Sequence, residues 1–201
     1  MKNIRAIAIF IIVCSVSSVA AFAQANAAAK PAEPPTIASV LDRQLSGIER
    51  NIMGAAEAVP ADKYDFSPAT ANIPGDFKTP TPVRTFGEQL KHIGDDLEAL
   101  GSGILGEKRA STADENGPKN VKTKDDVINY LKAAFAKGHS GIKTINQQNV
   151  VEEIQSPFGN NKVTRLALAV SMVGHSNNHY GQLIEYLRMN GMVPPESQPR
   201  K

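Results

Sequence analysis

Two histidines four residues apart are the residues of this sequence best suited to chemistry. His175 and His179 lie in the segment GHSNNHYGQLIEYLRMNG near the carboxyl end of the chain. In a helix each residue turns by about 100°, so both imidazoles lie on one face, one turn apart. Two imidazoles in this arrangement can bind one divalent metal ion. The spacing therefore predicts part of a metal site.

The residues around the histidine pair limit the kinds of metal site that it can form. The residues between the histidines are Ser, Asn and Asn, so the glutamate that acts as base in HExxH metalloproteases is missing. The same helix face carries four apolar side chains: Leu168, Met172, Leu183 and Tyr186. Buried polar groups need partners, and a metal ion is one such partner. Hydrogen bonds to the backbone or between the two rings are the alternative.

A third ligand has to come from another helix. His92 lies in the segment FGEQLKHIGDDLEAL, at the edge of an apolar seam. Three histidines from two facing helices would leave coordination positions for water or substrate. His139 stands between Gly138 and Gly141, and we expect it to be exposed.

Four other polar residues are candidates for supporting the site. Asp95 and Asp96 follow His92 by three and four residues, so either can reach the same helix face as an acceptor outside the ligand set, or remain a solvated charge. Asn178 and Gln182 either line the mouth of a pocket or satisfy hydrogen bonds elsewhere.

Hydrophobic periodicity predicts four helices that position these residues. We expect them at residues 36–59, 82–106, 123–145 and 162–190, with weak points at Gly138 and Gly141. No run alternates with period two, and no internal repeat is evident. The prediction is an all-α protein with one four-helix bundle over residues 36–197 and a short tail at 198–201.

The fourth helix is apolar on two faces. A second stripe lies opposite the histidines: Leu166, Val170, Val173, Ile184 and Leu187. The long connection that Tyr64, Phe66 and Phe77 would pin to the bundle is one cover for this stripe. A second subunit is the other, and we expect a homodimer.

The amino terminus predicts export. Lys2 and Arg5 precede an apolar stretch at 7–19, and Ala21-Phe22-Ala23 fits a signal-peptidase site. We expect a cleaved signal peptide at 1–23, a flexible leader at 24–35, and a periplasmic or secreted protein. The apolar stretch is too short for stable membrane insertion. Cleavage removes Cys14, the only cysteine, so the mature chain has no thiol ligand.

The charge balance excludes one class of partner. Of 22 Lys and Arg residues, two lie in the predicted signal peptide, which leaves 20 against 20 Asp and Glu. A formally neutral chain without basic runs has little electrostatic attraction for nucleic acid. We therefore expect no nucleic-acid partner. The open positions of the predicted metal site lead us to expect a small-molecule substrate.

Two segments together resemble the DinB-like superfamily. They are LKHIGDD on the second predicted helix and HSNNHYGQLIEYLRMNGMVPP on the fourth. The segment AAEAVPADKYDFSPA after the first helix is also similar, so the resemblance covers about residues 36–197. It implies an up-up-down-down-like four-helix bundle whose metal ligands are His92, His175 and His179.

The resemblance also suggests the function. Members of this superfamily bind zinc, nickel or similar divalent ions, and some are transferases or isomerases that use low-molecular-weight thiols. We therefore expect a metal-dependent enzyme of the thiol transferase or hydrolase type. The alternative is a non-enzymatic exported protein in which the histidine cluster binds metal or has a structural role.

Overall fold

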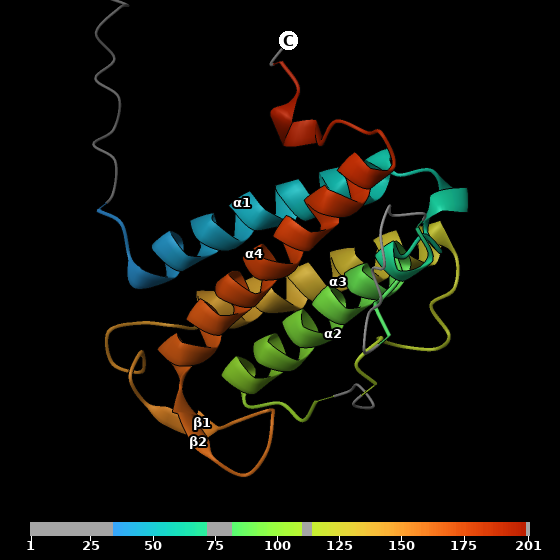
Figure 1. Cartoon of the computed structure of the whole chain (residues 1–201). Coiled ribbons are helices and arrows are strands. Elements are labelled where there is room, and N and C mark those ends of the chain that lie inside the picture. The colour runs from blue at the N-terminus through green and yellow to red at the C-terminus, as the bar shows by residue number, and fades with distance from the viewer. Residues whose placement is uncertain (1–33, 72–81, 110–113, 200–201) are drawn as a thin grey trace, which may run out of the picture. The chain divides into compact units, whose positions relative to one another are not determined.

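The computed structural model describes residues 34–71, 82–109 and 114–199. Four helices and one small hairpin form the fold (Figure 1). They are α1 (Ile37–Ala58), α2 (Phe86–Leu105), α3 (Lys124–Lys143), β1 (Glu153–Gln155), β2 (Lys162–Thr164) and α4 (Arg165–Met189). The four-helix prediction is confirmed. The predicted signal peptide, most of the predicted leader and Phe77 lie outside the described residues.

Each of the four helices begins at a threonine. Thr36, Thr85, Thr123 and Thr164 accept a hydrogen bond from the backbone N–H three residues later. This bond satisfies one of the amide groups that a helix start leaves without a partner. In α2 the Glu88 side chain also accepts from the Thr85 amide at 2.8 Å, which completes a capping box. The start of α2 is thereby fixed seven residues before His92.

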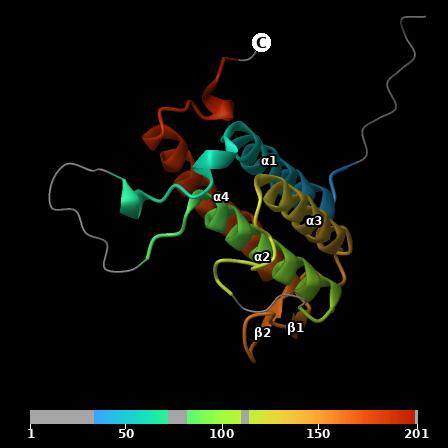
Figure 2. The same ribbon diagram turned by 90° about the vertical axis from the view of Figure 1, so that its right-hand side faces the viewer.

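The helices pack as a four-membered ring in the order α1, α3, α2, α4, as the two ribbon views show (Figures 1 and 2). α2 runs parallel to α3 and antiparallel to α4, while α1 runs antiparallel to α3. In chain order the directions are therefore up, down, down, up, which differs from the up-up-down-down order that the family resemblance implied. Because α2 and α3 are parallel, the connection between them at residues 106–123 has to bring the chain back to the other end of the bundle.

The core between the helices is mainly aliphatic. All six seam positions of α2 are buried: Phe86, Leu90, Ile93, Leu97, Leu100 and Ile104. The large side chains that face them from the other helices include Leu45, Ile52, Leu131, Phe135, Met172 and Leu183. The seam spacing of three and four residues keeps one side of α2 in the core along its whole length. The same spacing places His92 beside this seam.

Glycines bring α2 and α3 into close contact. A Cβ atom on Gly101 would lie 2.9 Å from the backbone of Lys137, and one on Gly141 would lie 3.0 Å from the Gly101 carbonyl oxygen. The weak points expected at Gly138 and Gly141 do not interrupt α3, which is continuous from Lys124 to Lys143. The contact with neighbouring helices, which a side chain would prevent, accounts for these glycines.

The hairpin is a feature that the sequence analysis missed. β1 and β2 pair antiparallel, with Ile154 opposite Val163. Consequently the fourth helix begins at Arg165 and not at residue 162. Strands of three residues are too short to show a period of two. The hairpin lies beside the carboxyl end of α2, where Arg165 Nε donates to the Ile104 carbonyl at 3.3 Å.

The second apolar stripe of α4 is only partly covered within the chain. Ile184 and Leu187 are buried, whereas Val170 is 56% exposed. Phe66 of the connection packs edge-on against Tyr186, which lies on the histidine face of α4 and not on the second stripe. The expected burial on two sides is therefore correct for the carboxyl-terminal half alone, and the homodimer stays a prediction. None of the described helices has the length and hydropathy needed to cross a membrane.

Candidate metal centre

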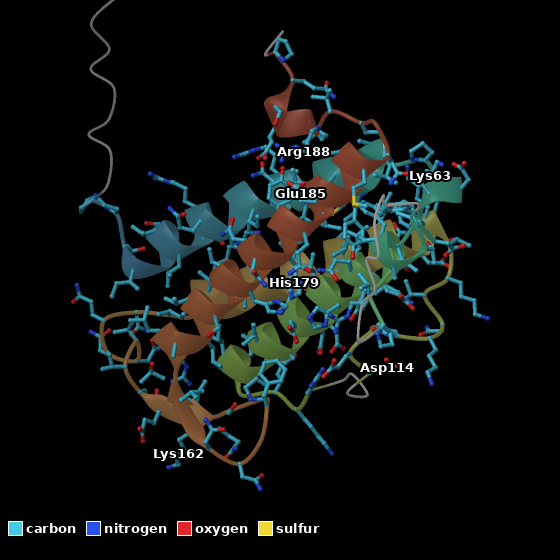
Figure 3. The ribbon with its side chains drawn as sticks, viewed as in Figure 1. Lys63, Asp114, Lys162, His179, Glu185 and Arg188 are labelled. Atoms are coloured by element: carbon cyan, nitrogen blue, oxygen red, sulfur yellow. The ribbon has the colours of Figure 1, made fainter. Side chains whose placement is uncertain are left out.

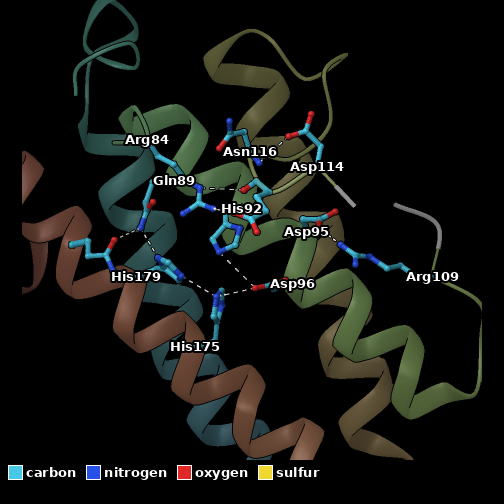
Figure 4. Close-up of polar contacts among 12 residues, drawn as sticks. Arg84, Gln89, His92, Asp95, Asp96, Arg109, Asp114, Asn116, His175 and His179 are labelled. Atoms are coloured by element: carbon cyan, nitrogen blue, oxygen red, sulfur yellow. Dashed lines mark hydrogen bonds and ion pairs between the residues drawn. The ribbon is translucent and has the colours of Figure 1, made fainter. Parts of the chain in front are cut away.

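Three histidines converge between α2 and α4. His92, His175 and His179 each offer a ring nitrogen, and these nitrogens all lie within 4.8 Å of one another. The Nε2 atoms of His175 and His179 are 2.9 Å apart, and the three ring centroids are separated by 4.2–5.0 Å (Figure 4). The structure therefore brings together the three residues that the sequence analysis singled out.

The antiparallel packing of α2 and α4 explains the convergence. His175 and His179 are one turn apart on α4, and His92 lies on the facing side of α2. His179 is buried near the middle of α4, while Glu185 and Arg188, on the outer side of the same helix, pair with each other in solvent (Figure 3). One face of α4 thus carries the cluster and another faces water.

A buried glutamine, which the sequence analysis missed, contacts the ring nitrogen of His179 on the side away from the other two histidines. The side-chain amide of Gln89 contacts His179 Nδ1 and lies 2.6 Å from Gln182 Oε1. Gln89 is 1% exposed, so these contacts replace its water. The sequence feature that could have indicated Gln89 is its position three residues before His92, on the same helix face. Gln182 belongs to this network, whereas Asn178 is exposed and has no hydrogen bond to the histidines within the described residues.

Of the two neighbouring aspartates on α2, Asp96 reaches the histidines. Its Oδ2 lies 2.8 Å from His175 Nε2 and 3.7 Å from His92 Nε2. Asp95 is buried and forms an ion pair with Arg109, whose guanidinium lies over the Phe158 ring. Asp95 therefore ties the segment after α2 to the bundle, and Asp96 belongs to the histidine cluster.

His139 corrects a sequence-based expectation. Its side chain is only 16% exposed, and its two ring nitrogens contact Asp42 at 2.6 Å and Glu49 at 3.1 Å. Both carboxylates come from α1, which the apolar pattern of α3 could not reveal. The two nitrogens face different partners, so His139 joins α3 to α1 and does not contribute to the histidine cluster.

The whole-chain comparisons identify the family. The description "DinB superfamily" belongs to the family profile that matches residues 44–183. The chain belongs to the DinB superfamily. Its match spans from the middle of α1 to α4 and includes all three histidines of the cluster. A comparison with curated proteins gives no match.

Solved structures share the fold of this DinB superfamily member. A DinB-like protein from Bacillus cereus is 14% identical with a TM-score of 0.58, covering 77% of this chain and 93% of its own. A DinB-like protein from Bacillus subtilis is 20% identical with a TM-score of 0.57, covering 80% and 99%. A conserved protein from Enterococcus faecalis is 14% identical with a TM-score of 0.55, covering 78% and 98%. At these identities the likeness shows the fold.

The environments of His179 and His92 favour neutral imidazoles. Burial, followed by the charges of His175 and His92, lowers the pKa of His179 to about 4. Burial and the nearby Arg84 also lower the pKa of His92. Burial alone would raise the pKa of Asp96, but its hydrogen bond and charge interaction with His175 keep it below the usual value. Neutral imidazoles are the form that binds metal ions.

The lowered pKa of His179 predicts an acid-sensitive metal-free protein. His179 binds a proton near pH 6.5 when unfolded but only near pH 4 when folded. Its contribution to stability is therefore complete above pH 6.5 and falls as the pH drops towards 4. From His179 alone we expect the free energy of unfolding to fall by about 2 kcal/mol between pH 7 and pH 5.

Urea unfolding in the presence of a chelator, at pH 7 and pH 5, measures this difference. His179→Gln removes the titrating group and should give a smaller difference between the two pH values than the wild type. An equal pH difference in the two proteins would contradict the prediction.

Proposed function

We propose that this DinB superfamily protein binds one divalent metal ion through His92, His175 and His179. The convergence of three ring nitrogens within 4.8 Å supports this proposal. Imidazole nitrogen suits zinc, nickel and related ions, so the donor set fits such an ion. The Gln89 amide contacts His179 Nδ1, the position at which a ligating histidine generally has an outer hydrogen-bond partner.

The bound ion would make the protein a metal-dependent enzyme of the thiol transferase or hydrolase type, acting on a small molecule. A divalent ion held by three protein ligands supplies Lewis acidity and a position for a substrate atom. The side chain of His175 is 28% exposed, so one edge of the cluster is accessible from solvent. This accessibility supports an enzyme over a sealed structural site.

One observation favours a non-enzymatic metal-binding protein as the second candidate. Asp96 lies 2.8 Å from His175 Nε2, and a fourth protein donor is typical of structural metal sites. The proposal also includes export and a homodimer. The apolar stretch at 7–19 with the following Ala21-Phe22-Ala23 supports export, and the exposed Val170 supports the dimer.

Metal analysis of single-alanine variants tests the proposed site. We expect about one equivalent of divalent metal in the wild type, and His92→Ala, His175→Ala and His179→Ala should each lose most of it, because two imidazoles remain. His139→Ala is the matched control, since it also removes a partly buried histidine but one outside the cluster. Equal metal contents in His139→Ala and His175→Ala would contradict the proposal.

A substrate screen then separates the enzyme from the non-enzymatic alternative. The metal-loaded wild type and His175→Ala are compared in thiol-conjugation and hydrolysis assays. Turnover by the wild type alone supports the enzyme. A wild type that binds metal without turnover in either class of assay supports the second candidate.

A further inference from the structure

Asp96 contacts the histidine rings at nitrogens that face the centre of the cluster. Its contact with His175 is at Nε2, the nitrogen that also lies 2.9 Å from His179 Nε2. Its second contact, with His92, is also at Nε2. A carboxylate that only orients a ligating histidine contacts the ring nitrogen turned away from the metal. Asp96 is not in that position.

The two helices supply donors in matching pairs. His92 and Asp96 are four residues apart on α2, just as His175 and His179 are on α4. Because the helices are antiparallel and facing, the two pairs meet across the interface. Asp96 borders the three-histidine cluster along the edge between His92 and His175.

The separations fit a common ion. Ligand atoms about 2.0–2.1 Å from a tetrahedral zinc ion lie about 3.3 Å from one another. The distances from Asp96 Oδ2 to the two Nε2 atoms, 2.8 and 3.7 Å, fall on either side of that value. An ion on His175 Nε2 would take the place of any proton on that nitrogen, because a ligating imidazole nitrogen carries none. The carboxylate is then left facing the ion.

We propose that Asp96 is a fourth protein ligand of the metal, so that an external ligand has to compete with its carboxylate for the ion. This inference rests on the proposed three-histidine site. The Asp96 side chain is 17% exposed, so it has room to turn towards solvent when it is displaced. Within the described part of the chain, its ion pairs are with His92 and His175, and these histidines hold it against the site.

Cobalt-substituted protein tests this role without an activity assay. Co²⁺ is loaded into the wild type and Asp96→Ala, and azide is titrated while the visible absorption of the cobalt is followed. Azide should bind at least about tenfold more tightly to Asp96→Ala, because competition by the carboxylate lowers the apparent affinity of the wild type. Co²⁺ itself should bind about 10–100-fold more weakly to the variant.

Two comparisons make the result decisive. Glu185→Ala removes an exposed carboxylate from α4 and should match the wild type in both titrations. Equal azide affinity in the wild type and Asp96→Ala would overturn the ligand role of Asp96 while leaving the three-histidine site intact. A wild type that takes up no Co²⁺, Zn²⁺ or Ni²⁺ would overturn the proposed site and this inference with it.

Discussion

Gly101→Ala should lower the free energy of unfolding by about 1–2 kcal/mol, because it forces apart two helices whose contact fixes α2. The added Cβ would lie 2.9 Å from the carbonyl carbon and oxygen of Lys137 on α3. Backbone atoms of a packed helix cannot move aside as the end of a flexible side chain can. Overpacking of this kind typically costs about 1–3 kcal/mol, more than alanine gains from its helix propensity.

Gly47→Ala is the matched control for this substitution. Gly47 is inside α1, and a Cβ atom there meets nothing within 4 Å. With no clash, the better helix propensity of alanine should raise the free energy of unfolding by about 0.5–1 kcal/mol. Urea unfolding of both variants and the wild type measures the two effects. Stabilisation by both substitutions would contradict the close contact at Gly101.

The periodic helices and the histidine pair were predictable because they rest on local spacing. The seam from Phe86 to Ile104 and the pair His175 and His179 follow the helical repeat, and both are found in the structure as expected. The start of α3 was also accessible, since Thr123 is followed by acidic residues in the first turn of the helix.

The parts that were missed depend on contacts between distant segments. His139 lies next to two glycines in the sequence, but its partners Asp42 and Glu49 are on another helix. Gly138 and Gly141 weaken a helix by propensity alone, whereas the neighbouring helices require their small size. Helix directions likewise depend on the long connections, whose path no periodic pattern encodes.

Gln89 illustrates how a site residue escapes a search for chemical groups. An uncharged amide neither ligates zinc strongly nor transfers protons, so its type alone attracts no attention. Its burial and its contacts with His179 and Gln182 give it a role. When an ion occupies Nε2 of His179, the proton must be on Nδ1, and that N–H needs an acceptor. In the structure the Gln89 Nε2 faces His179 Nδ1 and donates to Gln182 Oε1, so a 180° turn of both amides places the Gln89 oxygen against the Nδ1–H, with Gln182 donating to it.

Gln89→Leu should therefore weaken metal binding about 10–100-fold, the usual effect of removing the outer partner of a ligating histidine. Leucine keeps similar volume in the core but leaves the Nδ1–H of His179 without an acceptor, so the metal-bound ring loses stabilisation. Gln89→Glu keeps an acceptor at the same place and should retain tight binding. Competition with a chromophoric chelator measures all three affinities. Equal metal affinities in Gln89→Leu and the wild type would contradict this role of Gln89. They would mean that the helix backbone orients His179 without a hydrogen-bond partner at Nδ1.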